Sequence, residues 1–216
     1  MGLFTIIVLI AVLIFSIMIH EIAHGLAALW QGDWTAQQAG RLTLNPMKHL
    51  DPWGSFIIPF FLIISGVGIV FGWAKPVPYN PYNLRDQKYG PAIVGAAGPL
   101  SNLFLALFSG VLIRLLLVLG VSSSAFIFIV LALFVQTNIL LMIFNLLPIP
   151  PLDGSKLLFT FLPISEHTKQ LMEQYGFVFL LLFLYMFAGV FSVIVNFVMG
   201  IFSEYVVGVN IFSFLK

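Results

Sequence analysis

The sequence predicts an all-α polytopic membrane protein, a bundle of about five to six transmembrane helices. Of its 216 residues, 61% are hydrophobic and only 8% are charged, whereas charged residues make up about 25% of an ordinary soluble domain. Its apolar stretches are also long enough to cross a bilayer, which takes roughly 20 residues of helix. We therefore expect a single transmembrane domain over residues 1–216, with the lipid bilayer as its surroundings.

Charge and cysteine content narrow the classes of function. The formal net charge is +1, so the chain offers no basic surface for nucleic acid. It contains no cysteine, so it forms no disulfide, and any metal ion must be held by His, Asp or Glu side chains. The lack of cysteine is compatible with a prokaryotic cell membrane.

The first expected helix covers residues 3–30. From Leu3 to Ile19 its only polar side chains are Thr5 and Ser16, and no basic residue precedes it. A secretory signal has a basic start and a shorter apolar core, so we interpret this segment as a membrane span.

The other apolar segments follow in chain order at 56–71, 92–119, 125–147, 154–163 and 175–202. The first of them is preceded by a polar stretch, in which residues 40–46 alternate enough to predict a short strand-like excursion that offers an edge to an extended substrate. A loop rich in proline, tyrosine and charge at 73–89 is typical of a membrane interface. The short GVSSS turn at 120–124 separates the two central spans.

The helix at 125–147 ends in a proline-rich break, NLLPIPPLDG, at residues 145–154. Its three prolines lack backbone donors and interrupt a helix, while its apolar residues keep it at membrane depth. Irregular backbone at that depth is tolerated only where protein encloses it. We therefore expect this break to lie inside the bundle.

The sequence HEIAHG, residues 20–25, places ionisable side chains in an apolar helix. Each such group costs about 2.5–3.5 kcal/mol at the centre of a membrane span, so buried charges of this kind are usually functional. His20 and His24 are four residues apart and share a helix face, while Glu21 is rotated by about 100° from His20. This is the HExxH arrangement, in which two histidines bind Zn²⁺ and the glutamate takes a proton from the attacking water and passes it to the leaving amine.

A catalytic zinc site normally has a third protein ligand. The candidates are His49, His167, Asp153, Glu166, Glu173, Asp33, Asp51, Asp86 and Glu204. Most lie in polar turns or loops, where a solvated charge is the ordinary role. Asp153 stands out because it lies on the proline-broken segment, although it is also placed to cap the helix that begins near Gly154.

Three motifs together resemble the site-2 protease family of intramembrane zinc metalloproteases. They are HEIAHG in the first helix, GPLSN at 98–102, and NLLPIPPLDG at 145–154, which ends in LDG. They span about two thirds of the chain in the order of the family. The chain resembles a minimal form of that family, without an inserted PDZ domain.

This resemblance implies the identity of the site residues. By it, His20, His24 and Asp153 are the zinc ligands, Glu21 is the catalytic acid and base, and Asn102 lies near the site and binds the substrate or the oxyanion. An interhelical hydrogen bond is the alternative role of Asn102. The resemblance also implies a transmembrane protein as substrate, cleaved within or near its transmembrane segment in regulated intramembrane proteolysis.

Other interpretations remain open from the sequence. A metal-ion transporter or binding protein could use the same buried His, Glu and Asp cluster at a broken helix. His49 fits an interfacial histidine better than a gating or substrate contact. The polar residues Gln136 to Asn138 either line a wet cavity or join neighbouring helices by hydrogen bonds.

Overall fold

Four long helices dominate the computed structural model, which describes residues 3–57, 61, 64 and 74–215. They are α1 (Leu3–Trp30), α4 (Gly90–Val118), α5 (Phe126–Asn145) and α7 (Glu166–Ile201). All four are long and apolar enough to cross a membrane, the last with its continuation to Val207. No strand occurs among the described residues. The expected all-α polytopic membrane fold is thereby confirmed, while the apolar segment predicted at 56–71 lies mostly outside the described residues.

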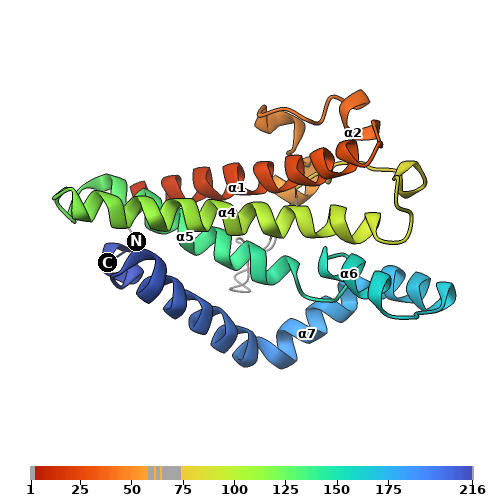
Figure 1. The fold of residues 1–216 in the computed structure, drawn as a ribbon. Coiled ribbons are helices and arrows are strands. Elements are labelled where there is room, and N and C mark those ends of the chain that lie inside the picture. The colour runs from red at the N-terminus through yellow and green to blue at the C-terminus, as the bar shows by residue number, and fades with distance from the viewer. Residues whose placement is uncertain (1–2, 58–60, 62–63, 65–73, 216) are drawn as a thin grey trace.

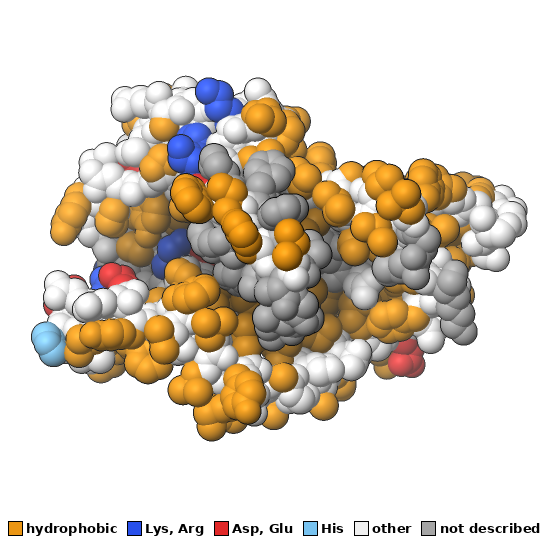
Figure 2. Space-filling view, turned by 180° about the vertical axis from the view of Figure 1, so that it is seen from behind, with side chains coloured by type: hydrophobic (Ala, Val, Ile, Leu, Met, Phe, Trp, Pro, Cys, Tyr) orange, Lys and Arg blue, Asp and Glu red, His pale blue; other side chains and the backbone are white. Residues whose placement is uncertain are grey.

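The helices α1, α4 and α5 lie side by side along one direction, while α7 is bent, with its middle away from them and its C-terminal end packed against α4 and α5 (Figure 1). The bend falls at Phe187, whose backbone angles of φ −116° and ψ 15° interrupt the helix. Large apolar side chains such as Phe104 and Phe197 are exposed on these helices, as lipid-facing side chains are. In the view from behind, hydrophobic side chains cover much of the surface, and charged ones gather mainly at the end where α2 and the start of α7 lie (Figure 2).

Short helices connect and complete the bundle. They are α2 (Thr35–Gln38) and α6 (Gly154–Phe161), and single turns at Pro46–Lys48, Pro52–Ile57, Pro81–Asn83, Phe202–Val207 and Ile211–Leu215. The helix α6 ends at Phe161 because Leu162, which precedes Pro163, adopts an extended backbone. The turn expected after α4 is present, with Gly120 at a φ of +77° that glycine adopts most readily.

Residues 40–46, where we expected a strand-like excursion, form bends instead. The side chain of Asn45 accepts a hydrogen bond from the backbone N–H of Met47, and Pro46 starts the following turn. An Asn-Pro pair of this kind favours a turn over an extended strand. This segment and α2 form a small lobe beside one end of α1 (Figure 1).

The last helix also begins earlier than the sequence predicts, at Glu166 instead of near residue 175. Ser165 caps it by accepting a hydrogen bond from the backbone N–H of Thr168, at 3.1 Å. The polar residues after Ser165 therefore form the first turn of α7 and not a separate turn.

The central packing joins α4 and α5 to the end of α7 and to the C-terminal turns. Its buried apolar residues are Ala106, Ile113, Phe128, Leu131, Ala132, Val135, Ile139, Met199, Phe202, Val207 and Ile211. Alanines at these contacts let the helix backbones approach closely, as in many membrane bundles. The helix α1, which carries HEIAHG, packs against both α4 and α5.

Candidate active site

Three ligand-type side chains meet in the interior of the bundle. His20 and His24 lie one turn apart on α1, and their Nε2 atoms are 3.0 Å from each other. Asp153 comes from the break before α6, and its Oδ2 lies 3.0 Å from His20 Nε2 and 3.2 Å from His24 Nε2. All three residues are buried. The structure thus brings together the two histidines and the one carboxylate that the sequence singles out, across 133 residues of chain.

Asp153 is placed by the irregular chain between α5 and α6. The next residue, Gly154, has no room for a Cβ, because one would collide with the carbonyl oxygens of Leu146 and Leu147. The tight fold-back brings residue 153 to α1. Asp153 occupies the N-cap position of α6 but makes no side-chain capping bond there. Its carboxylate faces the histidines instead.

Close contact between α4 and α1 also depends on a glycine. A Cβ at Gly98 would lie 2.5 Å from the Nε2 atoms of both His20 and His24. Real Cβ atoms essentially never approach other atoms that closely. The small residue in GPLSN therefore leaves the space into which the two Nε2 atoms point.

Hydrogen bonds on the outer side of each ring fix the tautomers of the two histidines. His24 Nδ1 lies 2.6 Å from the carbonyl oxygen of Val94, and His20 Nδ1 lies 2.6 Å from Asn102 Oδ1. Both oxygens accept, so both Nδ1 atoms carry the hydrogen in neutral rings. The Nε2 lone pairs then face Asp153, which is the tautomer that a metal-binding histidine uses.

This donor set fits a zinc ion. When both rings are neutral with hydrogen on Nδ1, two imidazole lone pairs and a carboxylate oxygen converge, an arrangement that a cation stabilises. Ligands at the usual bond lengths of about 2.0–2.1 Å in a tetrahedral site stand roughly 3.3 Å apart. The three separations here, 3.0, 3.0 and 3.2 Å, are close to that spacing.

A lysine that the sequence reading did not single out completes the surroundings of Asp153. Lys156 Nζ donates to Asp153 Oδ1 at 2.8 Å, which leaves Oδ2 for the histidine side. The same ammonium group lies 5.6 Å from the centre of the Tyr79 ring. In the sequence, the signal for this contact is the position of Lys156 three residues after Asp153, at the start of a helix.

Glu21 lies on the neighbouring face of α1, half-buried. Its Oε2 accepts a hydrogen bond of 2.7 Å from the backbone N–H of Val77. Residues 74–80 run as an irregular segment past this face, and Val77 fits beside Gly25, where a Cβ would lie 3.0 Å from the Val77 side chain. We call residues 74–80 the covering segment. It holds the carboxylate of Glu21 in place by its backbone.

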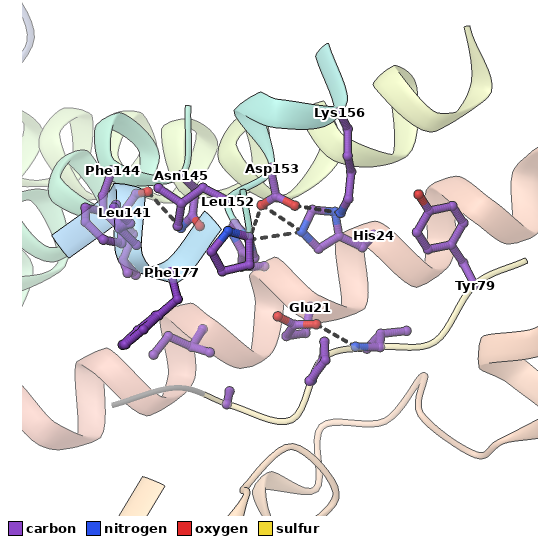
Figure 3. A pocket seen from close by; sticks show the side chains of 17 residues that line it. Glu21, His24, Tyr79, Leu141, Phe144, Asn145, Leu152, Asp153, Lys156 and Phe177 are labelled. Atoms are coloured by element: carbon purple, nitrogen blue, oxygen red, sulfur yellow. Dashed lines mark hydrogen bonds and ion pairs between the residues drawn. The ribbon is translucent and has the colours of Figure 1, made fainter. Parts of the chain in front are cut away.

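A cavity of about 580 Å³ connects these groups (Figure 3). Its lining residues are Ile17, His20, Glu21, His24, Ala74, Pro76, Val77, Tyr79, Leu141, Phe144, Asn145, Pro151, Leu152, Asp153, Lys156, Phe177 and Leu180. In Figure 3, Asp153 points toward His24 and Lys156, and Glu21 points toward the covering segment. The remaining wall is mostly apolar, so the cavity joins a charged centre to space suited to hydrophobic side chains.

Asn102, the predicted substrate-binding residue, is fully buried on α4. Its Oδ1 accepts from His20 and its Nδ2 donates to Asn138 at 2.8 Å. It does not appear among the residues that line the cavity. Contact between Asn102 and a substrate stays a prediction. In the structure Asn102 contacts the ring of His20, a candidate metal ligand.

The other candidate ligands lie elsewhere. The exposed ones are Asp86, Glu166, His167, Glu173 and Glu204. His49 is buried outside the cavity, and its Nε2–H donates to the carbonyl oxygen of Thr43 at 2.8 Å. Its own carbonyl accepts from the backbone N–H of Lys75 at 2.8 Å, which ties the lobe to the covering segment.

Asp33 has a structural role at the start of α2. It accepts hydrogen bonds from Thr35, from the side chain of Asn83 and from the backbone N–H of Asn80. Burial alone would raise the pKa of Asp33, but these hydrogen bonds together lower it below its ordinary value. Asp33 therefore anchors the far end of the covering segment.

Comparison with known proteins gives a consistent result. The model of a family described as Peptidase family M50 matches residues 114–184, a range that includes Asp153 but not HEIAHG. A Bacillus subtilis protein named as a zinc metalloprotease, YwhC, is 40% identical over 181 residues, which cover 81% of this chain and 79% of that protein.

Two mycobacterial proteins, both named as the zinc metalloprotease Rip2, are more distant. The protein from Mycolicibacterium smegmatis is 31% identical over 82% of this chain and 66% of its own length. The one from Mycobacterium tuberculosis H37Rv is 30% identical over 77% of this chain and 62% of its own length. No solved structure matches the chain significantly.

Proposed function

We propose that this chain, which belongs to peptidase family M50, the site-2 protease family of zinc metalloproteases, hydrolyses peptide bonds within or near transmembrane segments of membrane proteins. One observation carries the proposal. A carboxylate and a buried His, His and Asp cluster share one cavity, and membrane-spanning helices form much of its wall. Such a site suits an apolar segment that lies in the bilayer.

In this proposal His20, His24 and Asp153 hold the zinc ion. Bound zinc supplies Lewis acidity, which polarises a scissile carbonyl and makes water a better nucleophile at neutral pH. The protein contributes the fixed geometry. The Nδ1–H bonds to Asn102 and Val94 orient the rings, and Lys156 leaves a single oxygen of Asp153 for the metal side.

Glu21 moves the proton. Its carboxylate takes a proton from the water that attacks the scissile carbonyl carbon, and passes it to the leaving nitrogen as the C–N bond breaks. The Val77 N–H occupies Oε2, which leaves Oε1 to take the proton. A general acid and base placed in this way contributes about 10²–10⁴-fold to the rate.

The apolar wall suits a substrate from the membrane. Leu141, Phe144, Phe177 and Leu180 offer contacts for large hydrophobic side chains next to the charged centre. The scissile bond must be in an extended conformation, because the backbone of a helix already uses its own hydrogen bonds. A membrane-tethered regulator, cut in regulated intramembrane proteolysis, has this chemistry, and the bacterial relatives support a prokaryotic cell membrane as the location.

The test is cleavage of a transmembrane peptide by the purified protein in liposomes. The Glu21→Gln variant keeps the ligand set, so it should retain zinc and lose at least about 100-fold in cleavage rate. Glu166→Gln is the matched control, since that carboxylate is exposed at the start of α7. Cleavage by Glu21→Gln at the wild-type rate would refute the role of Glu21. Zinc flux into the liposomes without any cleavage would favour the metal-ion transporter.

A further inference from the structure

A chain of buried hydrogen bonds runs from the candidate zinc site into the core of the bundle. It passes from His20 on α1 to Asn102 on α4, then to Asn138 on α5, and returns to Ser16 on α1. Ser16, Asn102 and Asn138 each have an exposed fraction of 0%. One chain of buried hydrogen bonds thus joins three membrane-spanning helices, α1, α4 and α5.

The direction of every bond in this chain follows from its inner end. Asn138 Nδ2 lies 2.8 Å from the carbonyl oxygen of Phe134, which only accepts, so this atom of Asn138 must be the nitrogen. Its second hydrogen donates to Ser16 Oγ at 2.9 Å. Asn138 therefore turns its oxygen toward α4.

The orientation of Asn138 then sets that of Asn102. The oxygen of Asn138 accepts from Asn102 Nδ2 at 2.8 Å, so Asn102 must turn its own oxygen toward α1. That oxygen lies 2.6 Å from His20 Nδ1 and requires a hydrogen on it. If Asn102 were flipped, its NH₂ group would face Nδ1, and the ring would carry its hydrogen on Nε2, which points at Asp153 and His24.

We propose that Asn138 is a positioning residue for metal binding, which acts through Asn102 to keep the Nε2 lone pair of His20 free. This inference rests on the proposed function in taking His20 as a zinc ligand. Asn138 itself lies outside the residues that line the cavity. Its effect on the ring of His20 passes through the amide of Asn102.

If Asn138 only joined helices, its amide would not need to point in one particular direction. Any pair of polar side chains joins helices, whichever way their amides point. The chain of hydrogen bonds ends here on the imidazole ring of His20, and Ser16 lies one turn before His20 on the same helix. The backbone carbonyl of Phe134, at the other end, is a fixed acceptor that cannot reverse.

Two substitutions at residue 138 separate these roles. Asn138→Leu has nearly the same size and removes the acceptor for Asn102 Nδ2. Asn138→Asp keeps an oxygen that can accept from Asn102 Nδ2, while it replaces the two amide donors and puts an ionisable carboxyl group into the span. We expect Asn138→Leu to weaken zinc binding by about 10–100-fold, as loss of an outer partner of a ligand does, and Asn138→Asp to stay closer to the wild type.

Ile139→Ala is the control for stability, because Ile139 is a fully buried neighbour on α5 that takes no part in the chain. Zinc affinity is measured on the full-length protein in detergent by competition with a chelator. The tautomer of His20 is read from ¹⁵N spectra of histidine-labelled protein after zinc removal, and thermal unfolding is recorded for each variant. The wild type and Ile139→Ala should show hydrogen on Nδ1, and Asn138→Leu should show a shift toward hydrogen on Nε2.

The inference is overturned if Asn138→Leu keeps the wild-type tautomer and zinc affinity while it loses stability as Ile139→Ala does. If Asn138→Leu does not fold, Asn138→Asp still tests the inference, since loss of the Nδ1–H tautomer in that variant contradicts it. Neither measurement uses a substrate. A wild type that binds zinc but cleaves no peptide would therefore end the proposed function and leave this inference standing.

Discussion

Replacement of Gly98 by alanine tests the packing on which the site depends. The added Cβ would lie 2.5 Å from His20 Nε2 and His24 Nε2, whereas ordinary contacts are 3.4–4 Å. Relief therefore requires a movement of roughly 1 Å, while zinc–ligand distances tolerate only about 0.2 Å. A misplacement of about 1 Å can cost on the order of 100-fold in catalytic rate, and we take the same scale for metal affinity. We expect Gly98→Ala to lose about 100-fold in zinc affinity.

The effect of this substitution on stability should be smaller. Alanine gains about 0.8–1.0 kcal/mol over glycine in a helix, and overpacking costs about 1–3 kcal/mol, so the net change lies between about 0 and 2 kcal/mol. Gly110→Ala is the matched control on the same helix, because its Cβ would meet a Val206 side chain far from the site. Zinc affinity is measured by chelator competition. Wild-type affinity in Gly98→Ala would show that α4 does not confine the two histidines.

Two further predictions concern the surroundings of the site. A Cβ at Gly25 would lie 2.5 Å from the Leu42 side chain and 3.0 Å from that of Val77, so Gly25→Val should displace both and move the Val77 N–H away from Glu21. Peptide cleavage should then fall by at least about tenfold while zinc stays bound. Loss of zinc together with activity would contradict this division. Asp33 has a pKa below its ordinary value of 3.8, so its hydrogen bonds stabilise the fold above that pH, and the contribution is lost as pH falls through the lowered pKa. Thermal unfolding should show that the wild type is more stable than Asp33→Asn at neutral pH, and that this difference in stability shrinks below about pH 4. A difference that grows on acidification would refute this role.

The fold was predictable where hydropathy and local signals agree. The apolar runs near 3–30 and 125–147 correspond to α1 and α5, because length and composition suffice to indicate a span. Residues 166–169 were wrongly assigned to a turn, since their polarity hid the cap that Ser165 provides. The strand-like excursion at 40–46 failed for a similar reason, because the Asn45–Pro46 turn outweighs a weak alternation.

The candidate site was predictable in part. The four-residue spacing of His20 and His24 follows from helix geometry, and the proline break singles out Asp153. The contact between Lys156 and Asp153 is local, and its signal in the sequence is their three-residue spacing. The role of Val77 depends on a tertiary contact, since it reaches Glu21 only after the covering segment has folded against α1. The same holds for Asn138, whose amide direction is set by contacts with three helices.

The measurement that tests the central claim most directly is zinc per chain by elemental mass spectrometry, on the wild type and on Asp153→Ala. Glu166→Ala, at an exposed position, serves as the control. The account predicts about one zinc per chain in the wild type and the control, and a marked loss in Asp153→Ala. Full occupancy in Asp153→Ala would remove Asp153 from the ligand set. No zinc in the wild type after reconstitution would contradict the zinc site as a whole.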